Sequence, residues 1–107
     1  PWGSEFHATK CNNGFGRPTP VDAFPKGESP YGVADLVGNV WQMTDDVWCN
    51  GAYYFNIIRG GSWFRPESSW WYIKGGPQPL TTTQMQLLVS PGYDRSATVG
   101  FRCIKDL

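Results

Sequence analysis

The stretch that decides the fold is residues 31–46, YGVADLVGNVWQMTDD, where turn-forming residues give way to an apolar run. Apolar residues within 33–37 have the spacing of one short helical turn, which Gly38 would end. Residues 40–44 then alternate between apolar and polar side chains, as in a half-buried strand. We therefore expect a short helical turn followed by a strand.

Upstream of this stretch, residues 1–29 consist almost entirely of turn-forming sequence, as in CNNGFGRPTP and FPKGESP. Pro18, Pro20, Pro25 and Pro30 each bias the preceding residue away from helical backbone angles. We expect this segment to be loop. Since a buried loop has no regular ladder to satisfy its backbone hydrogen bonds, side chains must hold it in place.

Downstream, residues 55–58 form a β-type run that the glycine pair at 60–61 stops, and residues 98–104 form another such run. Residues 83–89 are compatible with either a helix or a strand. The expected architecture therefore has few strands, short helices and long ordered loops.

Composition and charge exclude several classes of protein. The 107 residues have room for one domain, and the 13 Gly and 9 Pro, with six Trp, five Tyr and six Phe, argue against a helical bundle. The formal net charge is +0. The chain therefore lacks the excess of basic residues that is typical of nucleic-acid-binding proteins and of proteins that bind membranes through basic residues. No apolar run approaches the roughly 18 residues that span a bilayer. We therefore expect no nucleic-acid partner and no membrane span.

The three cysteines, Cys11, Cys49 and Cys103, are far apart in the sequence and form no CxxC pair of the kind that holds zinc or a redox disulfide. Their odd number leaves one unpaired within the chain. Two interpretations stay open for each thiol. One is an ordinary buried cysteine, and the other is a disulfide of a secreted protein.

Several blocks of sequence together resemble the family of the formylglycine-generating enzyme, also called the sulfatase-modifying factor domain. They are PWG at 1–3, TPVDAFP at 19–25, SPYGVADLVGNVWQMTDD at 29–46, IIRGGSW at 57–63 and VGFRC at 99–103. The resemblance implies an α+β, C-type-lectin-like fold with little regular secondary structure, short antiparallel strands and long ordered loops. It also implies that residues 1–107 are the C-terminal part of such a domain, so that the absent N-terminal half is an expected partner.

The family contains copper-dependent oxidases that convert a sulfatase cysteine to formylglycine, together with sulfoxide synthases, other modifying enzymes and inactive relatives. In the oxidases, two cysteines follow the serine of the RGGS-like block, and such a thiolate pair selects Cu(I). The matching positions here hold Arg65 and Trp70, neither of which binds copper. We therefore expect no copper cofactor and no formylglycine-generating activity.

A structural calcium site is implied by the same resemblance. Its ligands would be a side chain at Asp35, backbone carbonyls at Gly38 and Val40, and a side-chain oxygen at Gln42. Calcium takes about six to eight oxygen ligands, which these groups and water could supply. Gln42 replaces the glutamate that is usual in the family, which removes one negative charge and should weaken the site.

A second calcium site of the family maps to the turn at Asn12, Asn13 and Phe15. For both sites a role without metal is the alternative. Asp35 would then be a capping aspartate, and Asn12 would close an Asx turn.

The aromatic residues after RGGS lie where the family builds its substrate groove. We therefore expect a ligand groove at Trp63, Arg65, Trp70 and Trp71. Aromatic faces in such a groove stack on sugar rings or clamp an extended peptide. Packing of these aromatic residues in the core is the alternative.

For the other charged or titratable residues we expect structural or surface roles. The family keeps the arginines at the positions of Arg59 and Arg102 as interior, hydrogen-bonded groups. Asp45 and Asp46 are adjacent, and adjacent strand residues point to opposite faces, so a shared catalytic site is not expected. His7 has no partner at ligand spacing, and we expect it on the surface.

Three functions remain open. The first is a non-oxidase member of the family, a calcium-supported, lectin-like domain that binds a glycan or a peptide. The second is an enzyme of the same superfamily that modifies a protein or a small thiol. The third is a structural module of a surface assembly. Cys103 matches a family cysteine that forms a disulfide with the N-terminal half, with Cys11 or Cys49 as other candidate partners, and we expect a secreted, periplasmic or cell-surface protein.

Overall fold

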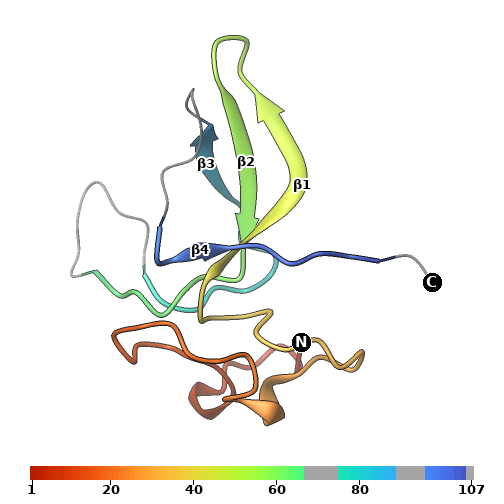
Figure 1. Cartoon of the computed structure of the whole chain (residues 1–107), viewed down its shortest axis with the longest axis vertical. Coiled ribbons are helices and arrows are strands. Elements are labelled where there is room, and N and C mark those ends of the chain that lie inside the picture. The colour runs from red at the N-terminus through yellow and green to blue at the C-terminus, as the bar shows by residue number, and fades with distance from the viewer. Residues whose placement is uncertain (67–74, 89–95, 106–107) are drawn as a thin grey trace.

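A small four-stranded sheet stands above a layer of loops in the computed structural model (Figure 1), which describes residues 1–66, 75–88 and 96–105. The strands are β1 (Trp41–Cys49), β2 (Tyr54–Arg59), β3 (Gln84–Leu88) and β4 (Val99–Gly100). Their order across the sheet is β3-β2-β1-β4. The β1–β2 and β2–β3 pairs are antiparallel and the β1–β4 pair is parallel, so the sheet is mixed.

Residues 1–40, which we call the loop layer, lie at one end of the sheet (Figure 1). Their only helices are two short 3₁₀ turns, η1 (Ala8–Lys10) and η2 (Pro25–Gly27). The loop prediction for residues 1–29 is therefore confirmed apart from these two turns. The described ranges contain no α-helix, so the helical part of the expected α+β class reduces to 3₁₀ turns.

The helical turn expected at residues 33–37 is wrong, because residues 33–35 are irregular and residues 36–37 form bends. Asp35 and Asn39 both have left-handed backbone angles, with φ of 53° and 61°, which interrupt a right-handed helix. The N–H of Gly38 donates to the carbonyl of Gly60 at 2.8 Å, so it makes a long-range bond in place of a helical one. Tertiary contacts therefore overrode the local spacing.

The strand expected at 40–44 is confirmed and extends as β1 to Cys49, because β2 pairs with it in antiparallel register. An irregularity between Met43 and Val47 shifts that register, as a β-bulge does. The strand at 55–58 is confirmed as part of β2. Pairing with β2 also decides the ambiguous segment at 83–89, which contains the strand β3.

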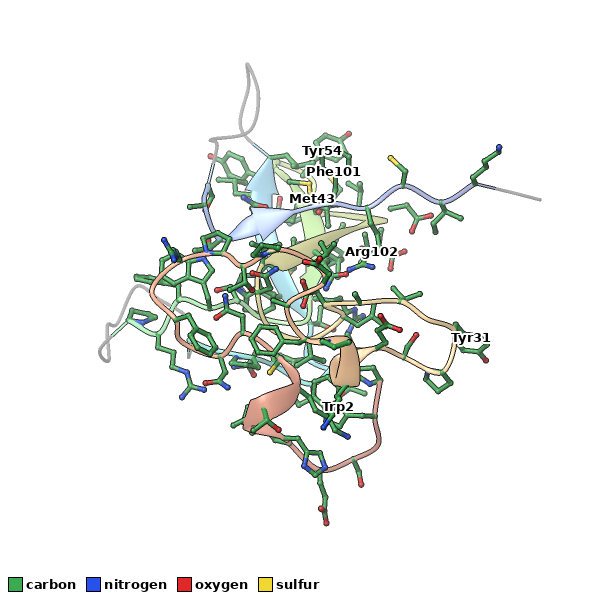
Figure 2. The ribbon with its side chains drawn as sticks, turned by 60° about the horizontal axis from the view of Figure 1, so that its bottom comes forward. Trp2, Tyr31, Met43, Tyr54, Phe101 and Arg102 are labelled. Atoms are coloured by element: carbon green, nitrogen blue, oxygen red, sulfur yellow. The ribbon has the colours of Figure 1, made fainter. Side chains whose placement is uncertain are left out.

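The strand predicted at 98–104 is shorter in the structure, where β4 is Val99–Gly100. Only Val99 and Gly100 pair with β1, and residues 101–105 are exposed beyond it. Arg102 donates hydrogen bonds to the carbonyls of Ala34 and Asp35, so side-chain bonds to the loop layer hold this segment where strand pairing has ended. Figure 2 shows Arg102 where the C-terminal segment passes the N-terminal loops.

Among the described residues, the buried interior is small and more than half of its members with side chains are polar. Its apolar members are Cys11, Val37, Trp41 and Ile58, and its polar members are Asn12, Ser29, Asn39, Gln42, Asn56 and Ser62. Many large apolar side chains remain exposed, including Val47, Trp48, Tyr53 and Tyr54 around the β1–β2 turn. Buried polar side chains must be hydrogen-bonded to be tolerated, so the interior depends on specific pairings as well as on apolar burial.

Candidate functional site

A groove of about 590 Å³ lies on one face of the sheet. Trp41, Ile58 and residues 84–86 of the sheet line it, together with residues 62–64, Pro66, Gly75 and the segment 96–99 that leads into β4. Since these residues come from separate parts of the chain, the groove exists only in the folded protein.

The glycines after β2 bring the segment 62–66 to the groove. Gly60 and Gly61 have φ of 92° and 75°, backbone angles that other residues rarely adopt. A side chain at Gly60 would also lie 2.5 Å from the carbonyl oxygen of Leu36. The carbonyl of Gly60 accepts hydrogen bonds from the N–H groups of Gly38 and Gln78. The RGG block therefore serves as a tight, close-packed corner, in agreement with its structural interpretation.

Trp63 lines the groove, where the sequence placed it, and its contacts hold it there. Its indole N–H donates to the carbonyl of Ala97 at 3.2 Å, and its backbone N–H donates to the carbonyl of Asn39 at 2.8 Å. Its ring packs edge-on against Phe64, with centroids 5.6 Å apart. Trp63 and Phe64 therefore form an aromatic wall.

The remaining predicted groove residues are distributed differently. Arg65 is exposed and does not line the groove, and its side chain extends beside Gly14 and Gly76. Trp70 and Trp71 lie outside the described residues. The groove also includes Trp41 and the glutamines of β3, which sequence reasoning missed, because only strand pairing brings them beside Trp63.

The described lining of the groove carries no charged side chain. Its polar members are the hydroxyl and amide residues Ser62, Gln84, Gln86, Ser96 and Thr98, and its aromatic members are Trp41, Trp63 and Phe64. Hydroxyl and amide groups exchange hydrogen bonds with neutral ligands, whereas a desolvated ion would find no opposite charge here. The lining therefore suits an uncharged ligand group.

The predicted calcium residues lie at the junction between the loop layer and the sheet. Asp35 accepts a hydrogen bond at Oδ2 from the side chain of Asn39 at 2.9 Å. Gln42 is buried, and its Nε2 donates to the carbonyl of Asp35 at 2.6 Å, while its Oε1 accepts from Nε of Arg102 at 2.8 Å. A cation at the Gln42 oxygen would therefore lie next to a fixed positive charge.

These residues fit calcium only in part. Asp35 is the single carboxylate of the predicted set, and calcium affinity rises with the number of charged ligands. Burial raises the pKa of Asp35, and the hydrogen bond from Asn39 and the charge of Arg102 offset this only partly. The folded carboxyl therefore keeps its proton to a higher pH than the unfolded one, so this group's contribution to stability falls as pH rises through its folded pKa.

Asn12 anchors the loop instead of presenting a free ligand oxygen. It is fully buried, and its Oδ1 accepts from the N–H groups of Gly14 and Phe15, while Nδ2 donates to the carbonyl of Arg17 at 2.8 Å. Both lone pairs of its oxygen are thus directed at backbone donors. The geometry supports the Asx-turn interpretation for Asn12.

Asn39 is the central residue that sequence reasoning missed. Its Oδ1 accepts from the backbone N–H of Thr19 at 2.9 Å and from Nδ2 of Asn12, and its Nδ2 donates to the carbonyl of Thr19 and to Asp35. The sequence held a signal for this role. Asparagine is one of the few residues other than glycine that often adopt left-handed backbone angles, and Asn39 lies between Gly38 and a predicted strand.

The whole chain, residues 1–107, matches the family described as "Sulfatase-modifying factor enzyme 1-like domain". The chain belongs to this family. The RGGSW corner and Arg102 lie in two of the blocks that carried the resemblance to this sulfatase-modifying factor family.

Individual relatives include both inactive and active proteins. The chain is 29% identical to "Inactive C-alpha-formylglycine-generating enzyme 2" of Bos taurus over 96% of its own length and 36% of the relative. It is 43% identical to "Hercynine oxygenase" of Mycolicibacterium smegmatis over 59% of the chain and 20% of the relative. Over 44% of the chain and 12% of the relative, it is 44% identical to "Formylglycine-generating enzyme" of Bos taurus. The chain thus spans about a third of the length of the inactive relative. No solved structure matches it significantly.

The cysteines of this sulfatase-modifying factor chain are all free thiols in the structure. Cys11 is buried in the loop layer, whereas Cys49 and Cys103 are exposed. The pairings of Cys103 with Cys11 or Cys49 are therefore not formed, and a partner outside the chain stays a prediction. Burial, together with the charge of Asp35, raises the pKa of Cys11 from 9.0 to about 11, so this thiol is protonated and unreactive at neutral pH.

The remaining polar residues take structural or surface positions. Arg59 donates to the carbonyl of Leu80 at 2.9 Å, and Asp45, Asp46 and His7 are exposed. Among residues 1–66, 75–88 and 96–105, no three His, Cys, Asp or Glu side chains gather where they could hold a metal ion. A search of the same residues found no helix with the length and apolar character needed to cross a membrane.

Proposed function

We propose that this chain is a non-oxidase member of the sulfatase-modifying factor family and that it binds a glycan or a peptide in the groove beside Trp63. One observation carries the proposal: the described lining combines the aromatic faces of Trp41, Trp63 and Phe64 with hydroxyl and amide groups and no charge. Aromatic faces and a few placed polar groups are typical of sites for small neutral ligands.

Two features support the absence of copper chemistry. The described lining of the groove contains no thiol, and Arg65 occupies one of the positions at which the oxidases carry a copper-binding cysteine. A guanidinium cannot replace a thiolate as a Cu(I) ligand. The fullest match among the relatives that we report is to a protein named as inactive, which agrees with this proposal.

The copper assay is direct. The chain is incubated with Cu(I), oxygen and a peptide that carries the sulfatase cysteine motif, and the peptide is weighed by mass spectrometry. We expect an unchanged peptide mass. A mass loss that corresponds to conversion of the thiol to an aldehyde would show that the chain is an oxidase.

A second candidate function is modification of a small thiol, which the similarity to hercynine oxygenase favours. This activity belongs to a relative of which the chain covers 20%, so groups outside the chain would have to contribute. Incubation of the chain with iron(II), oxygen, a small thiol and hercynine, which would supply the carbon that bonds to the sulfur while oxygen is reduced to the sulfoxide oxygen and water, distinguishes the two candidates. A sulfoxide product would favour the enzyme, and an unchanged thiol would favour the binding module.

We further propose that the fold is C-type-lectin-like and that the remainder of a longer domain packs against this chain. The small twisted sheet, the long loops and the family match support this assignment. Supporting evidence for a packing partner is the set of exposed apolar side chains, which includes Trp48 and Tyr54 near the β1–β2 turn and Phe101 beyond β4. A crystal structure of the longer protein would test both points.

The groove itself is tested by titration. Binding of a neutral oligosaccharide or a blocked peptide is followed by nuclear magnetic resonance of the indole N–H groups. We expect the Trp63 signal to shift, and we expect Trp63→Ala to weaken binding about tenfold or more. Trp48→Ala is the matched control, because Trp48 is an exposed tryptophan of β1 outside the lining. Equal losses in the two variants would contradict the assignment of the groove.

A further inference from the structure

Two buried amide oxygens on the groove face of the sheet have no hydrogen-bond donor. They are Oδ1 of Asn56 on β2 and Oε1 of Gln86 on β3, and no donor in the described part of the chain reaches either atom. Asn56 is only 4% exposed. A buried acceptor without a partner destabilises the folded state, so two of them in one small domain call for a physical explanation.

The two side chains lie beside each other. Asn56 and Gln86 are register partners in the antiparallel β2–β3 pair, so both project from the same face of the sheet. Side chains at directly opposed positions have Cβ atoms about 4.5–5.5 Å apart. The next pair of this face toward the groove, Ile58 and Gln84, lines the groove, as Gln86 does itself. Gln86 therefore belongs to the lining, and Asn56 lies beside it behind the inner end of the groove.

The orientation of Asn56 is determined by its other hydrogen bonds. Its Nδ2 donates to the carbonyls of Thr44 at 2.8 Å and of Asp46 at 3.3 Å, which belong to the irregular part of β1. Both N–H groups are used there, so rotation of the amide would lose two bonds. The oxygen must point away from β1, and it can only accept.

A pair of acceptor oxygens selects a ligand that brings two donors. Neighbouring hydroxyl groups of a sugar ring do so while remaining uncharged, whereas an extended peptide presents backbone N–H and C=O groups alternately. The described lining holds no charge that would compensate a buried ammonium or guanidinium. The faces of Trp41 and Trp63 nearby suit the C–H face of a sugar ring.

We propose that Asn56 and Gln86 form a polar subsite of the groove that accepts hydrogen bonds from two neighbouring hydroxyl groups of one neutral sugar ring. This subsite rests on the proposed function, since it requires that the groove beside Trp63 binds ligands. It narrows that function to glycans, and it assigns the inner end of the groove to a hydroxyl pair.

The test titrates the full chain with the methyl glycosides of glucose, mannose and galactose and with their fully O-methylated derivatives. The derivatives keep the ring and its acceptors but lack hydroxyl donors. The side-chain amide signals of Asn56 and Gln86 and the indole signal of Trp63 report where binding occurs. We expect at least one free glycoside to shift all three signals, and its O-methylated derivative to shift none of them.

Two variants of β3 provide the matched comparison. Gln86→Leu removes the acceptor, and we expect it to weaken glycoside binding about tenfold. Leu87→Ala changes the same strand on its opposite face, outside the described lining, and we expect a change below about threefold. Gln86→Glu keeps an acceptor oxygen and should retain most of the affinity. Preserved amide spectra establish that each variant is folded.

The possible failures are distinguishable. Glycoside binding at Trp63 that Gln86→Leu leaves unchanged would overturn the subsite and leave the groove function intact. Binding of a blocked peptide without binding of any glycoside would also overturn the subsite while supporting the peptide form of the proposed function. If neither glycoside nor peptide shifts the Trp63 signal, the subsite and the proposed function both fail.

Discussion

The loop layer and the β1–β2 hairpin are built in opposite ways. In the loop layer, buried amide side chains such as Asn12 and Asn39 satisfy the backbone, and a regular ladder is absent. In the hairpin, strand pairing satisfies the backbone, and large side chains such as Trp48 and Tyr53 remain exposed. The stability of the loop layer is therefore concentrated in a few side chains, whereas that of the hairpin is distributed along its ladder.

Asn39→Ala should have the largest effect, because it breaks the hydrogen bonds that join Thr19, Asn12 and Asp35. We expect the free energy of unfolding to fall by about 3–5 kcal/mol, since several buried groups lose their partners together. Urea unfolding followed by tryptophan fluorescence measures it. The matched hairpin variant is Asn50→Ala, which removes only turn bonds to the N–H groups of Ala52 and Tyr53 and should cost about 1 kcal/mol. Equal losses of unfolding free energy in Asn39→Ala and Asn50→Ala would refute the contrast between the loop layer and the hairpin.

A pair of glycines sharpens the same contrast at the level of the backbone. Gly38 and Gly51 both have positive φ, 77° and 93°, but a Cβ at Gly38 would lie 2.5 Å from the carbonyl oxygen of Asn12, and one at Gly51 would meet nothing within 4 Å. We expect Gly38→Ala to lower the free energy of unfolding by about 3 kcal/mol, because it adds both backbone strain and overpacking. We expect Gly51→Ala to lower it by about 1 kcal/mol, because it adds backbone strain alone. Thermal unfolding of the two variants is the measurement. A Gly51→Ala cost that matches the Gly38→Ala cost would show that local strain dominates.

The buried thiol of Cys11 should make stability depend on alkaline pH. Its folded pKa of about 11 exceeds the ordinary value of 9.0, so the unfolded state loses its proton first and stability falls as pH rises through this interval. We expect a loss on the order of 1–2 kcal/mol between pH 8 and 11, which Cys11→Ala should remove.

Reactivity of the thiols gives an independent check. Exposed Cys49 and Cys103 should react with a thiol reagent at once in the native protein, whereas Cys11 should react only on unfolding. Three equally fast thiols would contradict the burial of Cys11. In protein isolated from its natural source, a blocked Cys103 would instead support the predicted disulfide and a secreted or periplasmic location.

Calcium should have the smallest effect. With Gln42 bonded to Arg102 and Asp35 as the single carboxylate, we expect millimolar calcium to raise the stability by less than about 1 kcal/mol. Gln42→Glu adds a charge at a ligand position and should increase this stabilisation, and Asp35→Ala should abolish it. Melting curves in calcium and in chelator provide the measurement. Stabilisation that persists in Asp35→Ala would place the ion elsewhere.

Local sequence was sufficient to predict the loops and two of the strands, because these features depend on residue type. Prolines and glycines confined residues 1–29 to turns, alternating side chains predicted β1, a β-type run predicted β2, and positions 65 and 70 after RGGS hold no cysteine. Trp63 lines a groove in the structure, and ligand binding there stays a prediction. Local sequence failed at residues 33–37, because a bond between Gly38 and Gly60 replaced the helical one.

Tertiary structure alone decided which polar groups meet. Thr19 and Asn39 lie in different blocks of the sequence, and their hydrogen bonds form only when the loop layer folds onto itself. Asn56 and Gln86 face one another because β3 pairs with β2 in a single register, and a shift by one residue would place them on opposite faces. Residue type determines whether a side chain can donate or accept a hydrogen bond. Only the long-range pairing of the backbone determines which partner the side chain meets.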